Sequence, residues 1–137
     1  MPRTVVLTYR RHPHEVMLLA LCLVQGLAYA IGQPRPGSVA ALLPPPLVAV
    51  WYWMLLTSGF VGIVGNLWPG HLLTGLRVRL AGMLLAASPA AAYGITLLAL
   101  AGARASFAAG VVFAWAAACL WRAGQILADL RQIGGPQ

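Results

Sequence analysis

Side chains that could carry chemistry are few in this sequence, and they are not grouped. The 137 residues include two carboxylates, Glu15 and Asp129, which lie near opposite ends of the chain. General acid–base catalysis and magnesium binding use carboxylates that converge on one point. His12 and His14 have no third zinc ligand nearby, and no glycine-rich phosphate loop occurs. The sequence therefore predicts no enzyme, no metal site and no cofactor.

Gln25 is the polar side chain closest to the middle of the first apolar run. Polar groups inside membrane spans often mark transport pathways, so this amide could line a pore or bind a substrate. It could equally donate a hydrogen bond to a neighbouring helix, which is the interpretation we favour. Cys22 and Cys119 also fall in apolar runs, where we interpret them as small hydrophobic side chains.

Long apolar runs dominate the chain and predict its fold class. Hydrophobic residues make up 61% of it and charged residues 8%, with a mean hydropathy of +0.82. About 20 helical residues cross the ~30 Å hydrocarbon core of a bilayer. Residues 80–121 carry a single charge, Arg104, and are long enough for two spans. We predict an all-α integral membrane four-helix bundle in one domain, residues 1–137, with spans at residues 16–32, 47–67, 80–101 and 105–121.

Small residues recur at four-residue spacing along the last three of these predicted spans. On one face of a helix they let backbones approach closely, which is how helices associate within lipid. We therefore predict that these positions form helix contacts, and that they also join copies of the chain into a homo-oligomer. They are Gly82, Ala86, Ala90 and Gly94; Ser106, Gly110, Ala114 and Ala118; and Ser58 and Gly62.

The arginines predict how the chain is oriented in a cytoplasmic (inner) membrane. With both termini in the cytoplasm, the inner segments hold seven arginines and the outer loops two, which agrees with the positive-inside rule. Because the arginines flank apolar runs, the net charge of +7 points to the lipid bilayer as the partner and not to nucleic acid. The arginines expected at lipid headgroups are Arg10, Arg11, Arg77, Arg79 and Arg122.

The segments outside the spans have predicted forms of their own. The proline-rich residues 33–46 predict an extended connection, and residues 71–79 a short polar one. Residues 122–137 predict an amphipathic helical extension along the inner membrane surface. A basic head, an apolar core and Ala28-Tyr29-Ala30 also resemble a cleavable secretory signal within residues 1–30, although we favour an uncleaved first span.

Two stretches, TYRRHPHEVMLLAL at residues 8–21 and ACLWRAGQILADLRQI at residues 118–133, carry a resemblance to known proteins. With them the chain resembles small four-span membrane proteins of actinobacteria and their phages, several of which are holins. The resemblance implies a holin-like role, in which copies accumulate, associate laterally and permeabilise the membrane. Two alternatives remain open: a non-lytic scaffold or accessory subunit that docks a cytoplasmic protein partner, and a small channel or transporter that uses Gln25.

Overall fold

The structure, a computed structural model, describes residues 13–134, and this part of the chain is helical throughout apart from short connections. It contains no strand in that range. The elements are α2 (Pro13–Ala30), α3 (Gly37–Leu42), α4 (Pro45–Leu67), α5 (Leu72–Ala101), a 3₁₀ turn η1 (Gly102–Ala105) and α6 (Ser106–Gly134). The all-α prediction is confirmed for these residues.

Prolines and glycines set the ends of several helices. Pro45 occupies the first turn of α4, where its missing N–H removes no intrahelical hydrogen bond. The turn between α4 and α5 is Trp68–His71 and contains Pro69 and Gly70, which do not continue a helix. α5 ends at Gly102, whose φ of 54° lies in the left-handed region that glycine adopts without strain.

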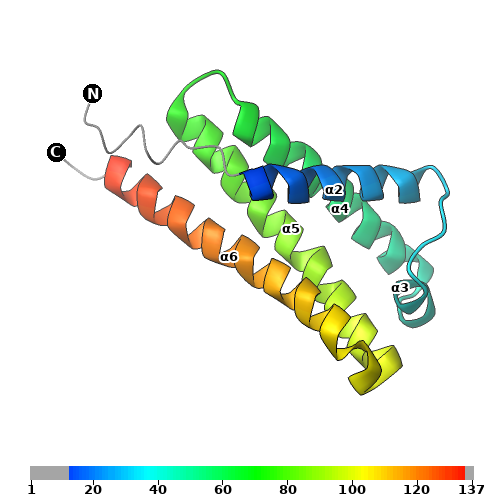
Figure 1. Cartoon of the computed structure of the whole chain (residues 1–137). Coiled ribbons are helices and arrows are strands. Elements are labelled where there is room, and N and C mark those ends of the chain that lie inside the picture. The colour runs from blue at the N-terminus through cyan, green and yellow to red at the C-terminus, as the bar shows by residue number, and fades with distance from the viewer. Residues whose placement is uncertain (1–12, 135–137) are drawn as a thin grey trace.

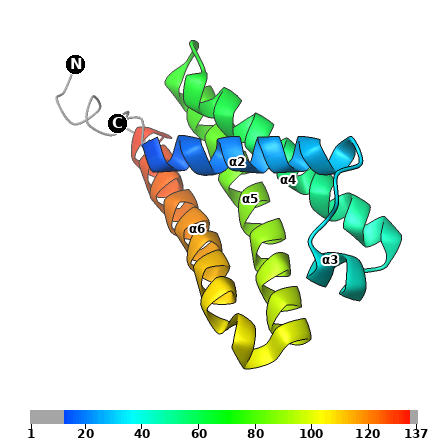
Figure 2. The ribbon, with the colours of Figure 1, turned by 45° about the vertical axis from the view of Figure 1, so that its right-hand side comes forward.

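α4, α5 and α6 run antiparallel, each beside its neighbour in the sequence, and α5 lies in the middle (Figure 1). α2 packs on α4 and crosses it obliquely, as Figure 2 shows after a turn of 45°. The start of α2 therefore lies at the same end of the molecule as the α4–α5 turn and the last turns of α6. We call this the Glu15 end.

Three helical segments are long and apolar enough to cross a membrane. They are Pro13–Ala30, Pro45–Leu67 and the continuous stretch Leu72–Gly134, which contains α5 and α6. Helices of this length and composition indicate a membrane protein.

The connections differ from their predicted form. Residues 72–79, expected as a polar loop, are the first turns of α5. Gly37–Leu42, expected as extended chain, forms the short helix α3, which packs on α5 with Val39 buried. The prolines lie on either side of Gly37–Leu42 and not within it, so nothing prevents one and a half turns of helix there.

The C-terminal extension also differs from its predicted position. α6 continues as one helix to Gly134, and Ile126, 1% exposed, belongs to the hydrophobic core. This segment therefore packs on the bundle through Ala123 and Ile126, whereas residues 131–134 are exposed. At about 1.5 Å per residue the 30 residues of α5 extend about 45 Å, which exceeds the ~30 Å hydrocarbon core.

Candidate functional site

Four helices converge on one carboxylate at the Glu15 end. Glu15, in the first turn of α2, accepts hydrogen bonds from Nε and Nη2 of Arg79 on α5. Its Oε2 atom also lies 3.3 Å from Nε of Arg122 on α6. Asn66 on α4 points its Nδ2 at Glu15 Oε1, 3.5 Å away, and donates to the Gly62 carbonyl at 2.9 Å. We call these four side chains the Glu15 cluster.

The Glu15 cluster is buried and carries a net positive charge. Glu15, Asn66 and Arg79 are 8%, 6% and 5% exposed. One carboxylate faces two guanidinium groups, so one positive charge is left over once the pair with Arg79 is counted. Removing one partner of a buried ion pair leaves the other charge without compensation, which is strongly destabilising. The cluster therefore ties the start of α2 to α5 and α6.

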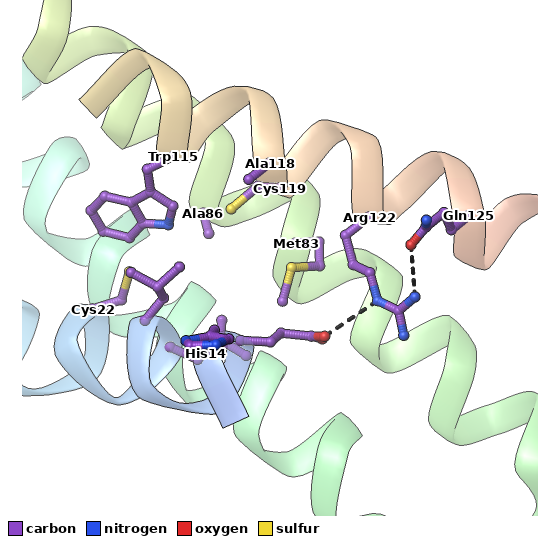
Figure 3. Close-up of a pocket in the computed structure, with 12 residues that line it drawn as sticks. His14, Cys22, Met83, Ala86, Trp115, Ala118, Cys119, Arg122 and Gln125 are labelled. Carbon is purple, nitrogen blue, oxygen red and sulfur yellow. Dashed lines mark hydrogen bonds and ion pairs between the residues drawn. The ribbon is translucent and has the colours of Figure 1, made fainter. Parts of the chain in front are cut away.

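A crevice opens beside the Glu15 cluster, between α2 and α6, with α5 as its floor. Its volume is about 230 Å³, and its walls are mainly apolar side chains. Figure 3 shows Trp115, Cys119 and Arg122 extending from α6 on one side, and His14 and Cys22 on α2 on the other. Its walls include Leu18 on α2, Met83 and Ala86 on α5, and Trp115, Ala118 and Arg122 on α6.

A second chamber of about 250 Å³ adjoins the crevice on the side away from the Glu15 end. Cys22 and Trp115 line both chambers and mark the boundary between them. Aromatic rings dominate the second chamber: Trp51 lies 5.7 Å from Tyr29 and 6.1 Å from Tyr93, centroid to centroid. Trp51 is fixed in place because its Nε1 donates to the Pro89 carbonyl at 2.9 Å.

Trp115 and Gln25 are polar side chains of the crevice walls whose hydrogen-bonding groups are largely unused by residues 13–134. The Nε1 atom of Trp115 is buried and makes no hydrogen bond, and the thiol of Cys119, a weak acceptor, lies beside it. Gln25 lines the second chamber, and its amide forms no hydrogen bond with the described residues. Among residues 13–134, the interhelical hydrogen bond expected for Gln25 is therefore not formed.

The small residues of α4 and α5 face inward. A Cβ atom on Gly82 would fall within 3.0 Å of the Gly62 backbone, so α4 and α5 touch main chain to main chain at this point. Ala86, Ala90 and Gly94 are also buried on α5, and Gly94 packs against the ring of Phe113. Ser58 is buried on the same side of α4, with its hydroxyl bonded to the Leu55 carbonyl.

The small residues of α6 face outward, contrary to their expected role in packing within the bundle. Ser106, Gly110 and Ala114 are exposed on the outer side, Ala118 is exposed in the crevice wall, and a Cβ on Gly110 would meet nothing within 4 Å. The buried positions of α6 are instead spaced by seven, three, four and three residues, the repeat of a coiled-coil seam. They are Ala109, Ala116, Cys119, Ala123 and Ile126.

The arginines expected at lipid headgroups divide into two kinds. Arg77 is exposed, whereas Arg79, two positions later, is buried in the Glu15 cluster. Arg122 is partly buried and shares Glu15. Arg10 and Arg11 lie outside the described residues.

The sequence carried one signal that was missed. Glu15 and Arg79 each lie next to a long apolar run, and a carboxylate and an arginine in such positions can pair when their helices meet.

No group of three or more His, Cys, Asp or Glu side chains among residues 13–134 is placed to hold a metal ion. Cys22 and Cys119 are free and buried. Comparisons of the chain with models of protein families, with curated proteins and with solved structures find no match.

Proposed function

We propose that this protein is a holin-like membrane protein whose copies associate laterally through the outward face of α6. The observation that carries the proposal is the exposed stripe Ser106, Gly110 and Ala114. Ala118, the next position at this spacing, is exposed in the wall of the crevice between α2 and α6 and is not part of this surface. Small residues on a lipid-facing surface allow a second helix to approach closely, and this close packing drives helix association in bilayers. The small residues of α4 and α5 cannot serve this purpose because they are already used inside the bundle.

The surroundings of the stripe support the same role. Phe107 and Trp121 on α6 are 85% and 75% exposed. Large apolar side chains next to small ones give a surface of ridges and hollows into which a second copy can fit. In the proposed mechanism, copies accumulate in the cytoplasmic membrane with both termini inside, join through α6 and open a lesion that releases or activates a lytic enzyme.

Substitution of Gly110 tests the proposal. Gly110→Leu fills the hollow of the stripe and leaves the fold intact, because nothing lies within 4 Å of that site. We expect it to delay or abolish loss of membrane potential on controlled expression in a bacterial host, and to reduce crosslinking between copies. Gly124→Leu, on the same helix and equally open, is the matched control.

Two results would refute the mechanism. One is wild-type protein that leaves the membrane potential unchanged at high expression. The other is Gly110→Leu protein that dissipates the potential on the same schedule as wild type. Gly94→Leu cannot replace Gly110→Leu, since Gly94 packs on Phe113 and its replacement would disturb the bundle itself.

A second candidate function is a small channel or transporter, which the free amide of Gln25 favours. Gln25 lines the aromatic chamber with its hydrogen-bonding groups unused by residues 13–134. A solute crossing through the crevice would meet that amide. Flux into liposomes that is lost in Gln25→Leu would support this function, and flux that survives the substitution would remove Gln25 from it.

A further inference from the structure

We propose that the crevice between α2 and α6 binds one acyl chain of an acidic phospholipid, with the lipid phosphate at Arg122. The site combines a cationic rim at the Glu15 end with an apolar channel behind it. This inference concerns a ligand within a single copy of the chain, and it does not depend on lateral association through α6.

The charge at the rim selects an anion. Both oxygens of Glu15 are occupied by Arg79, and Oε2 is shared with Arg122, so an incoming cation would find no free carboxylate. Arg122 uses Nε for Glu15 and Nη1 for Gln125 Oε1, at 2.8 Å. The Nη2 atom of Arg122 has no partner among the described residues. Because Arg79 pairs with Glu15, Arg122 supplies the excess positive charge of the Glu15 cluster. A phosphate oxygen is a strong acceptor for a guanidinium N–H.

The walls behind the rim suit a hydrocarbon chain. Leu18 on α2, Met83 and Ala86 on α5, and Ala118 on α6 line the first chamber. Met83 is unbranched and adaptable, so its thioether can follow the shape of a flexible chain. The second chamber extends the path for the distal part of the chain. Basic pockets between membrane helices are known sites for acidic lipid headgroups.

The buried N–H of Trp115 points to oxygen in the ligand as well as carbon. Trp115 Nε1 lies in the wall with only the thiol of Cys119, a weak acceptor, beside it, and a buried donor without a strong acceptor is unfavourable. A phospholipid places ester carbonyls between its phosphate and its acyl chains. Such a carbonyl enters the crevice behind the phosphate and can accept this hydrogen bond.

The crevice is reached from the side, where lipid would be. Leu21 lines the second chamber and is 45% exposed, so the chamber wall is also part of the outer surface of α2. Met17 and Val24, on α2, are 70% and 60% exposed. A lipid in the surrounding bilayer can therefore enter between α2 and α6 without leaving the hydrocarbon phase.

Quenching of Trp115 by brominated lipid tests the site. The full chain, in phosphatidylcholine vesicles, is titrated with phosphatidylglycerol brominated on its acyl chains, and separately with brominated phosphatidylcholine. The Trp115 contribution is the difference between wild type and Trp115→Phe. We expect the fluorescence of Trp115 to fall to half at a mole fraction of brominated phosphatidylglycerol about fivefold lower than that of brominated phosphatidylcholine. About one favourable arginine–lipid contact has an effect of this size.

Matched variants locate the contact. Arg122→Gln should remove the preference for phosphatidylglycerol, whereas Arg131→Gln, the same change on an exposed turn of the same helix, should keep it. Ala118→Phe should reduce quenching by blocking the chamber. Ala117→Phe, exposed on α6 and outside the crevice lining, should not. Equal thermal unfolding temperatures in detergent show that a loss of quenching is not a loss of fold.

Three outcomes would overturn the proposal. The first is equal quenching of Trp115 by the two brominated phospholipids. The second is equal behaviour of Arg122→Gln and Arg131→Gln. The third is stronger quenching by a brominated free fatty acid than by phosphatidylglycerol, which would assign the crevice to a free carboxylic acid and not to a phospholipid.

Discussion

Arg79 and Glu15, 64 residues apart in the sequence, form a buried two-point ion pair at the place where α2 meets α5. α2 packs on α4, and this pair adds a charged contact between α2 and α5. We expect Arg79→Gln to lower the free energy of unfolding by about 3–5 kcal/mol, because Glu15 would keep its charge with only part of its compensation. Thermal or denaturant unfolding in detergent micelles measures the change.

Arg77→Gln is the control for that experiment. It removes the same charge two residues earlier, from an exposed position, and should change the free energy of unfolding by less than about 0.5 kcal/mol. Equal effects at positions 77 and 79 would show that the ion pair does not hold α2 in place.

Gly82→Ala should destabilise the contact between α4 and α5. The added methyl group would fall within 3.0 Å of the Gly62 main chain, which cannot move aside as a flexible side chain can. Overpacking of this kind typically costs about 1–3 kcal/mol. Gly110→Ala adds the same methyl group in open space, where the higher helix propensity of alanine should leave stability unchanged or slightly raised. Unfolding midpoints of the two variants provide the comparison, and an equally stable Gly82→Ala protein would contradict the close approach.

Ile126→Ala should destabilise the bundle by about 2–5 kcal/mol, since Ile126 is 1% exposed within the core. The adjacent Leu127 is 40% exposed, and Leu127→Ala should have a much smaller effect. Denaturant unfolding of the two single variants measures both. A tail that lay on the membrane surface apart from the bundle would make Ile126→Ala harmless.

A binding partner of the tail is best sought with Leu127 variants, because deletion of residues 123–137 would also remove part of the core.

Membrane-impermeant maleimide labelling should place the η1 turn of the α5–α6 hairpin on one side of the bilayer. It should place the start of α5 and the end of α6 on the other side. Thr74 and Ala128 are exposed at the Glu15 end, and Ala103 is exposed in η1 at the opposite end, so a cysteine is introduced at each of these positions in turn. We expect the first two to be labelled from one side and the third from the other, in a background in which the natural cysteines are replaced. Labelling of all three from the same side would contradict the crossing of α5 and α6.

Hydrophobicity was sufficient to predict the four long helices, though not α3 or the first turns of α5, because a run of apolar residues between turn-forming residues has few alternatives. It was not sufficient to predict which face of each helix is inside. The four-residue spacing succeeded on α5, whose buried surface is wide because α4 and α6 flank it. The same spacing failed on α6, which lies at the edge of the bundle and buries only one narrow face. Residues spaced strictly by four turn gradually around the helix and so leave that narrow face.

The Glu15 cluster could not be predicted from charge alone. Arg77 and Arg79 look equivalent in the sequence, and only the helical turn that begins at Leu72 separates their faces. The crevice was also hidden from sequence reasoning. It lies between side chains of α2 and α6, and α2 takes an oblique path across α4 that no local sequence pattern encodes.

Each long helix of this molecule packs on the one that directly precedes or follows it among α2, α4, α5 and α6. A chain with this arrangement can fold helix by helix during synthesis, because the helix on which each new helix packs has already been synthesised. The two ion pairs of Glu15 are exceptions, because they join α2 to α5 through Arg79 and to α6 through Arg122, which lies 107 residues along the chain from Glu15. The pair with Arg122 is the longer-range of the two. It can form only after nearly the whole polypeptide has been inserted, so it would be the last tertiary contact of the Glu15 cluster to close.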